Sequence, residues 1–322
     1  MVKKFKMTKI FLKDLVINSA QLGEGELVLL VHGWPELWYS WRHQIKPIAD
    51  MGFKVIAIDM RGYGESSKPQ EIEKYDMKSL MQDIIDIIDH QKRKSAILIG
   101  HDWGAPICWN TAAIFPDRVK AVIGLSVPFS QRGNISNIEL WKKLYVNKFF
   151  YQIYFQSEGI AEKEFEENIN LSLRKIYYSI CSEGIDASIK PGKAGPNSSF
   201  LEGIPNPNPF PKWLNNFDLQ YYTSAFEKSG FRGPLNRYRN QDRDWEMLPE
   251  LSYLKINQPS FFIGGEKDPV RYFIKGKDTY ENPGKNCNNF LGKKIIRNTG
   301  HWVQQESPKE VTNCILEFLK LL

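Results

Sequence analysis

Short apolar runs alternate with amphipathic stretches over the first 125 residues of the chain. Four runs have the length of a strand: residues 26–31, 53–58, 96–99 and 119–125. Runs that are apolar throughout are typical of strands buried on both faces, as in a parallel sheet. We therefore predict four buried, parallel strands.

An amphipathic helix is predicted between the second and third runs. Apolar residues recur there at helical spacing, at Met77, Leu80, Met81, Ile84 and Ile88. We expect Asp83, Asp86 and Asp89 on the solvent side of this helix. The alternation of strands and helices predicts an α/β fold built on a mostly parallel, doubly wound sheet.

The alternation stops near Ser130 and resumes near Ser260, where SFFIGG and KKIIRN again have the pattern of strands. We predict that residues 1–130 and 255–322 form the core domain. Residues 131–254 are then an insertion, which we interpret as a helical lid over the carboxyl edge of the sheet.

The insertion has three parts. Residues 141–180 are aromatic-rich with a helical pattern, residues 191–211 form a Pro/Gly/Asn-rich loop, and residues 218–228 return to a helical pattern. After the last strand, Ser307-Pro308-Lys309-Glu310 has the form of a capping box with proline at the first helical position. The helix that follows should pack on the sheet through Val311, Ile315, Phe318, Leu319 and Leu322.

The composition is that of a globular protein. The chain has 322 residues, 42% of them hydrophobic, which is enough for a sizeable core. Its formal charge of +6 is spread over scattered Lys and Arg among nearly as many acids, which argues against nucleic acid as a partner. Apolar runs have strand length, so no membrane span is expected.

Cysteine usage and the first residues suggest a compartment. None of the four cysteines forms a C-x-x-C pair, and buried free thiols are expected. Lys13 and Asp14 interrupt the only apolar stretch near the start, and no cleavage site follows, so we expect no secretion signal. These features favour a reducing cytoplasm.

The sequence Gly100-His101-Asp102-Trp103-Gly104 follows one predicted strand and precedes a helical pattern. This is the form of a nucleophile elbow, a sharp turn whose small flanking residues present the central side chain at a helix amino terminus. The centre is Asp102, and no G-x-S-x-G motif occurs in the chain. A carboxylate nucleophile is therefore predicted, and a serine hydrolase is not.

An ester on a carboxylate must be hydrolysed by water, which requires a base and an acid that orients it. His301 follows the strand KKIIRN and is the natural base, since imidazole accepts a proton at neutral pH. The segment after SFFIGG supplies the acid, Asp268, with Glu266 as the alternative. The chain order of nucleophile, acid and base matches the α/β-hydrolase order.

The segment His32-Gly33-Trp34-Pro35-Glu36 follows the first predicted strand and should lie beside the elbow. The amides of Trp34 and Trp103 are the expected oxyanion donors. The loop Asp59 to Gly64 lacks the third glycine of a dinucleotide motif and is interpreted as structural. No metal-ligand cluster or phosphate loop is visible, so no metal or other cofactor is expected.

With these motifs the chain resembles the soluble epoxide hydrolases from about Lys9 to the final helix. The motifs HGWPE, DMRGYGESS, GHDWG, YQIYFQ, GFRGPLNRYRN, EKDPV and GHW occur in family order. The resemblance is to the hydrolase domain of the animal enzymes without their phosphatase domain. It implies an α/β-hydrolase fold and a single-domain enzyme that converts a small hydrophobic epoxide and water to a diol, as a monomer or homodimer.

The resemblance also implies roles for lid residues. Two lid tyrosines in the family hydrogen-bond the epoxide oxygen; the motifs place them at Tyr151 and Tyr238, with Tyr154 as the nearby alternative to Tyr151. Phenols remain protonated at pH 7 and can donate to a developing alkoxide. The resemblance further suggests a cis bond before Pro35, and a role for Glu36 and His101 in holding the hydrolytic water.

Two other functions are considered. A haloalkane or haloacid dehalogenase shares the aspartate elbow, the histidine base and the lid, and Trp103 could hold a halide, but it has no use for two phenolic donors. A non-catalytic binding protein of the same fold would usually have lost a catalytic group, whereas each expected group is present. Both tyrosine motifs favour epoxide hydrolysis.

Overall fold

The computed structural model describes residues 5–187 and 195–322. Its centre is an eight-stranded sheet with the order β1-β2-β4-β3-β5-β6-β7-β8. The strands are β1 (Lys6–Phe11), β2 (Val16–Leu22), β3 (Glu26–Val31), β4 (Phe53–Ile58), β5 (Ala96–His101), β6 (Val119–Leu125), β7 (Ser260–Gly265) and β8 (Phe290–Ile296). Neighbours from β4 to β8 pair in parallel, whereas β2 pairs antiparallel with β1 and β4. The mostly parallel sheet is confirmed.

The six strands predicted from apolar runs are present, but β1 and β2 were not predicted. Most residues of β1 are exposed, and β2 contains buried polar side chains whose partners lie in other segments. Asn18 Nδ2 donates to Asp59 Oδ2 at 2.8 Å, and Ser19 Oγ donates to the carbonyl of Thr8 at 2.9 Å. A polar residue that is buried in this way hides the apolar pattern by which strands are recognised.

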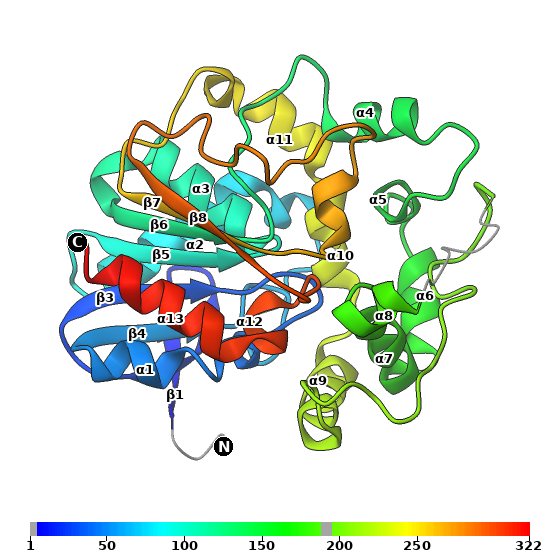
Figure 1. Ribbon diagram of the computed structural model, residues 1–322, viewed down its shortest axis with the longest axis horizontal. Helices are drawn as coiled ribbons and strands as arrows, with labels where there is room; N and C mark the ends of the chain where they lie inside the picture. Colours follow the sequence, from blue (N-terminus) through cyan, green and yellow to red (C-terminus); the bar gives the residue numbers. More distant parts are fainter. Residues whose placement is uncertain (1–4, 188–194) are drawn as a thin grey trace.

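Helices cover both faces of the sheet (Figure 1). On one face α1 (Ile45–Asp50) packs on β4, and α13 (Pro308–Leu319) packs on α1, β7 and β8. On the other face α2 (Met77–His90) packs on α3 (Gly104–Ile114), which contacts β5 and β6. This is the doubly wound arrangement expected from the sequence.

Between β6 and β7 the described residues contain helices and no named strand. They are α4 (Asn137–Leu144), α5 (Tyr151–Tyr154), α6 (Ile160–Glu166), α7 (Ile169–Ser179), α8 (Ser182–Asp186), α9 (Asn216–Ser229), α10 (Arg232–Arg239), α11 (Gln241–Met247) and the 3-10 helix η5 (Pro249–Ser252). Figure 1 shows α5 to α9 grouped beside one end of the sheet. The helical pattern over 141–180 is thus divided among short helices.

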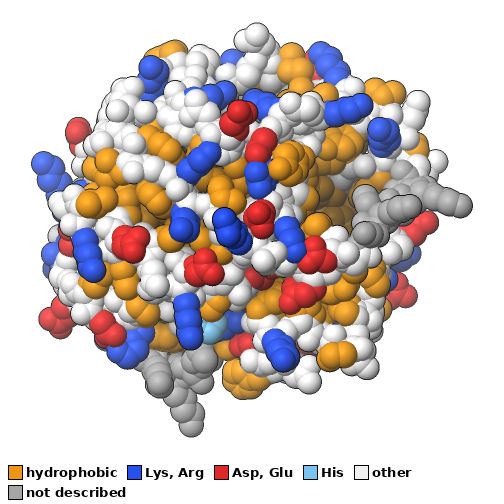
Figure 2. All heavy atoms as spheres, viewed as in Figure 1, with side chains coloured by type: hydrophobic (Ala, Val, Ile, Leu, Met, Phe, Trp, Pro, Cys, Tyr) orange, Lys and Arg blue, Asp and Glu red, His pale blue; other side chains and the backbone are white. Residues whose placement is uncertain are grey.

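The remaining helices are the 3-10 turns η2 (Trp38–Trp41), η3 (Ile72–Tyr75), η4 (Pro116–Arg118) and η6 (Pro269–Tyr272), and the α-helix α12 (Val303–Glu306). Of the predicted loop over 191–211, residues 195–211 form turns and irregular chain, and 191–194 lie outside the described residues. No helix in the described ranges is both long and apolar enough to cross a membrane. Basic and acidic side chains are interspersed on the face seen in Figure 2.

The predicted capping box at the start of α13 is wrong. Ser307 Oγ lies 2.7 Å from Thr299 Oγ1 and does not cap the helix, while Glu310 is exposed. The helix still begins at Pro308, whose missing N–H would be unpaired at that position. Ser307 instead ties the start of α13 to the chain just before His301.

Candidate active site

The turn between β5 and α3 holds Asp102 in a backbone conformation that few non-glycine residues adopt. Its φ is +49°, in the left-handed region, and its side chain is 14% exposed. A Cβ on Gly104 would lie 2.1 Å from the carbonyl oxygen of Val31, so only glycine permits this close approach of the turn to β3. The elbow therefore projects Asp102 from the carboxyl edge of the sheet.

His301 lies between two carboxylates. It follows β8, and its Nδ1 is 3.0 Å from Asp268 Oδ2, while its Nε2 is 3.6 Å from Asp102 Oδ2. Asp268 follows β7 and is fully buried. The alternative acid Glu266 accepts the amide hydrogen of Asn298 instead, so the structure brings Asp268, and not Glu266, to the imidazole.

His301 and Asp268 each shift the pKa of the other. Burial alone would lower the pKa of His301, but the negative charges of Asp268 and Asp102 outweigh it and raise the pKa well above its usual value. Burial alone would raise the pKa of Asp268, yet His301 and the hydrogen bonds to the carboxylate lower it. An imidazole with one charged partner on each nitrogen can accept, hold and release a proton.

One oxygen of Asp102 already has a donor. The amide of Trp34 donates to Asp102 Oδ1 at 2.7 Å. A Cβ on Gly33 would lie 2.3 Å from that of Asp102, so the absence of a side chain allows the contact. The Trp34-Pro35 bond is cis, as the resemblance suggested. Trp103, the second expected donor, follows Asp102 directly at the amino end of α3.

Tyr151 on α5 and Tyr238 on α10 lie together, with ring centroids 5.8 Å apart. Burial, followed by neighbouring groups that include the Asp102 carboxylate, raises the pKa of both phenols. The Tyr151 hydroxyl accepts a hydrogen bond from Gln152 Nε2 at 2.9 Å, which leaves its own proton free to donate. Both phenols therefore stay protonated within the electrostatic reach of Asp102.

Tyr154, the alternative to Tyr151, faces another part of the segment between β6 and β7. Its hydroxyl donates to Glu164 Oε2 at 2.7 Å. Glu164 also accepts hydrogen bonds from two backbone amides, those of Phe200 and Leu201, so the tyrosine belongs to a hydrogen-bond cluster within the segment between β6 and β7. The structure thus does not bring the Tyr154 hydroxyl to Asp102, and its role in substrate binding stays a prediction.

Glu36 and His101 form a fully buried ion pair. His101 Nδ1 lies 2.7 Å from Glu36 Oε2, and its Nε2 lies 2.8 Å from the carbonyl oxygen of His301. Burial would raise the pKa of Glu36, but the charge and hydrogen bond of His101 lower it.

The remaining acceptor positions of Glu36 are also filled. The amide of Gly33 donates to Oε2, and the side-chain amides of Gln304 and Gln305 both donate to Oε1. A carboxylate has about four lone-pair positions, and protein donors lie at each of them. The pair also contacts the backbone of His301 through His101 Nε2. That Glu36 and His101 hold the hydrolytic water stays a prediction.

Sequence reasoning missed two residues that contact this site. The Tyr280 hydroxyl donates to Asp268 Oδ2 at 2.8 Å. Glu306 accepts hydrogen bonds from the amides of Gly300 and Trp302, on either side of His301, and from that of Ser182 on α8, each at 2.9 Å. Tyr280 lies in no motif, so no sequence signal indicates it. Glu306 lies five residues after His301, and this short separation is the one signal that could have suggested a contact with the site.

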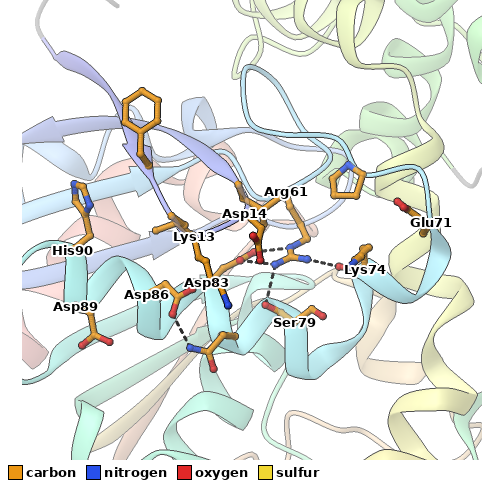
Figure 3. Close-up of a pocket in the computed structure, with 15 residues that line it drawn as sticks. Lys13, Asp14, Arg61, Glu71, Lys74, Ser79, Asp83, Asp86, Asp89 and His90 are labelled. Carbon is orange, nitrogen blue, oxygen red and sulfur yellow. Dashed lines mark hydrogen bonds and ion pairs between the residues drawn. The ribbon is translucent and has the colours of Figure 1, made fainter.

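A separate pocket of about 840 Å³ lies between the β1–β2 turn, the chain after β4 and α2 (Figure 3). None of its lining residues belongs to the predicted site. Arg61 extends across it and pairs with Asp83, and Arg61 also donates to the carbonyls of Lys74 and Ser79 (Figure 3). Asp83 is therefore buried, which corrects the prediction that it faces solvent. In the described ranges no three His, Cys, Asp or Glu side chains are grouped as metal ligands.

The chain matches known proteins over most of its length. Residues 26–308 match the family described as alpha/beta hydrolase fold. Epoxide hydrolase A of Mycobacterium tuberculosis is 38% identical over 307 residues, which are 94% of this chain and 93% of that protein. Bifunctional epoxide hydrolase 2 of Sus scrofa is 35% identical over 305 residues, which are 94% of this chain and 53% of that protein.

Solved structures agree with the sequence relatives. An epoxide hydrolase from an endophytic Streptomyces has a TM-score of 0.93 and 36% identity, covering 99% of this chain and 96% of that one. These relatives are named for epoxide hydrolysis, which favours that reaction over dehalogenation and over a non-catalytic protein. The chain belongs to the α/β-hydrolase fold family and, within it, to the epoxide hydrolases.

Proposed function

We propose that this enzyme hydrolyses its epoxide in two steps, through an ester on Asp102. The observation that carries the proposal is the position of His301, with Nδ1 3.0 Å from Asp268 and Nε2 3.6 Å from Asp102. In that position a base reaches the water that attacks an ester on Asp102, and its second nitrogen is held by a carboxylate.

In the first step Asp102 attacks a ring carbon of the epoxide. Since Oδ1 accepts from the Trp34 amide, we assign the attack to Oδ2. A bond forms between Oδ2 and the carbon, the ring C–O bond breaks, and the epoxide oxygen takes a proton from Tyr151 or Tyr238. The raised pKa of each phenol supports the donor role, because an ionised tyrosine could not donate.

In the second step water attacks Cγ of the ester while His301 Nε2 takes a proton from it. The oxyanion then develops on Oδ1, where the Trp34 amide already donates and the Trp103 amide is the proposed second donor. The Cγ–Oδ2 bond then breaks, and Oδ2 leaves with the diol and takes the second proton of the attacking water. The oxygen of that water remains in the restored carboxylate. The proton on His301 returns through solvent to the phenolate, so the net reaction adds one water to the epoxide.

The ester also prepares the base. One cause of the raised pKa of His301 is the negative charge of Asp102, which is lost when the carboxylate becomes an ester. The pKa of His301 then falls, so that neutral imidazole is available at the step that needs it. Alkylation thereby activates the group that removes the alkyl product.

We further propose that the substrate is hydrophobic and that residues 131–254 act as a lid. Aromatic rings surround the two tyrosines: Trp34 and Tyr238 centroids are 5.9 Å apart, and Phe155 and Phe200 stack at 5.5 Å. Such a wall favours apolar substituents on the epoxide. The four free cysteines suit the reducing cytoplasm expected from the sequence.

The test is the variant His301→Gln, mixed with styrene oxide and analysed by intact mass. We expect the mass of one epoxide to add to the protein and to map to Asp102, because alkylation proceeds and hydrolysis does not. The matched control His90→Gln changes an exposed histidine and should turn over without accumulating an adduct. An adduct on another residue, or an active Asp102→Ala variant, would remove Asp102 as the nucleophile.

A further inference from the structure

The loop between η6 and β8 places a buried tyrosine against the acid of the site. We infer that Tyr280 is a positioning residue for the hydrolysis step, which holds the Asp268 carboxylate toward His301 and limits its basicity. Tyr280 is 1% exposed, and its hydroxyl lies 2.8 Å from Asp268 Oδ2. The inference rests on the two-step mechanism proposed above.

Both oxygens of Asp268 are held. The amide of Val270 donates to Oδ1 at 3.0 Å, and the Tyr280 hydroxyl donates to Oδ2. His301 Nδ1 approaches the same carboxylate at 3.0 Å from Oδ2 and 3.2 Å from Oδ1. With one fixed donor on each oxygen the carboxylate cannot rotate, so its plane stays directed at the imidazole.

The tyrosine ring sits in a slot that β7 leaves open for it. A Cβ on Gly264 would lie 2.4 Å from Cε2 of Tyr280, so this strand position must lack a side chain. Phe262, two residues earlier on β7, packs edge-on against the ring at a centroid distance of 4.7 Å. The slot fixes the ring independently of the hydroxyl, which would allow a phenylalanine to occupy it.

The hydroxyl has one proton and two acceptors. It lies 2.5 Å from the carbonyl oxygen of Ser126 as well as 2.8 Å from Asp268 Oδ2. A hydrogen bond to a charged oxygen is stronger than one to a neutral carbonyl, so the proton favours Asp268 while that group is ionised. By sharing the negative charge, the phenol weakens the hold of Asp268 on a protonated His301.

Other charged and titratable groups face this cluster. Asp102 and the ring of His101 face His301, with the two imidazole rings 4.9 Å apart. The Arg271 guanidinium lies 5.2 Å from the centroid of the Tyr280 ring and pairs with Asp278. The charge of Asp268 also reaches Tyr151. Replacing Tyr280 with phenylalanine leaves all of these in place and removes only the donor.

The experiment is rapid-mixing kinetics of Tyr280→Phe with styrene oxide, which separates ester formation from ester hydrolysis. We expect ester formation to change less than about twofold and hydrolysis at pH 7 to slow by about threefold to tenfold, as for loss of a hydrogen bond to a charged group. Without the donor, Asp268 holds the imidazolium more firmly. We call the low-pH side of the pH–rate profile, where hydrolysis slows because His301 is protonated, the acid limb. It should therefore move to higher pH, by roughly half a pH unit.

A matched control separates this effect from loosening of the loop. Tyr145 donates to the carbonyl of Phe273 at 2.8 Å and so anchors the start of the same loop without contacting Asp268. Tyr145→Phe should lower the melting temperature and leave the acid limb in place. In Tyr280→Phe, an unmoved limb, or equal losses in both steps, would overturn the inference.

A second substitution covers the case in which Tyr280→Phe does not fold. Incorporating 3-fluorotyrosine at position 280 keeps the ring and makes the phenol a stronger donor, so the acid limb should move to lower pH. A limb that stays unchanged there would equally overturn the inference. If no variant, including His301→Gln, forms an ester, the two-step mechanism itself fails. If the ester forms and is hydrolysed but the acid limb does not move, only the inference about Tyr280 fails.

Discussion

The amide of Trp34 donates to Asp102 Oδ1 at 2.7 Å, although the two residues are 68 positions apart in the chain. The carboxylate is thus polarised before substrate arrives, with one oxygen held and the other directed toward His301. A donor that is in place in the resting enzyme needs no reorganisation when negative charge returns to that oxygen during ester hydrolysis.

The two lid phenols should contribute to ring opening in a partly redundant way. Single Tyr151→Phe and Tyr238→Phe changes should slow ester formation by roughly tenfold each, and the double change should nearly abolish it, because no donor remains for the alkoxide. Stopped-flow measurement of ester formation checks this. Tyr154→Phe is the control, since its hydroxyl is bound to Glu164. An unchanged rate in the double variant would remove both tyrosines from the mechanism.

Folding stability should depend on pH through His301. Burial would lower its pKa, but Asp268 and Asp102 raise it well above 6.5. The folded chain then binds this proton more tightly than the unfolded chain, so the stabilisation is complete below the unfolded pKa and is lost as pH rises through the folded pKa.

The matching measurement is urea unfolding of the wild type and of His301→Gln between about pH 5 and about pH 9. The wild type should lose its advantage in free energy of unfolding as the pH rises above 6.5, the usual histidine value. Parallel stability curves for the two proteins would mean that His301 has no raised pKa in the folded chain.

The buried Glu36–His101 pair should contribute mainly to the free energy of unfolding, and to catalysis only through the backbone of His301. In Glu36→Gln a side-chain NH₂ would face groups that all donate, which leaves at least one buried donor without a partner. We expect a loss of about 3 kcal/mol in the free energy of unfolding. The control Glu71→Gln alters an exposed glutamate and should change it by less than about 0.5 kcal/mol.

Chemical denaturation of both glutamate variants, together with kcat, distinguishes two roles for Glu36. A scaffold role predicts lower stability, and a lower rate because the backbone of His301 is less well held. A role in holding water predicts a slower hydrolysis step at unchanged stability. The second result would contradict the assignment of its four acceptor positions to protein donors.

The strands that position the site could be predicted because each contains a short run of apolar residues. Parallel strands end at the same edge of a sheet, so residues after β5, β7 and β8 were expected to meet, and Asp102, Asp268 and His301 do lie together. The roles of Tyr151 and Tyr238 came from family motifs, since aromatic residues at helical spacing are usually core.

Other features depend on contacts between distant segments that local sequence cannot reveal. Asp83 has the spacing of a solvent-facing residue, yet Arg61 reaches it from the loop after β4. The Tyr280 hydroxyl meets the carbonyl of Ser126, which lies 154 positions away, and no motif surrounds either residue. Such contacts arise from the path of loops between strands, where sequence periodicity carries no signal.

The covalent role of Asp102 is tested most directly by a single turnover in H₂¹⁸O with enzyme in excess over styrene oxide. The ester mechanism predicts that the first diol contains no ¹⁸O, because its added oxygen comes from Asp102. It also predicts that the label appears in the peptide containing Asp102. A first-turnover diol that carries ¹⁸O, with an unlabelled peptide, would show direct attack by water and would contradict the ester mechanism.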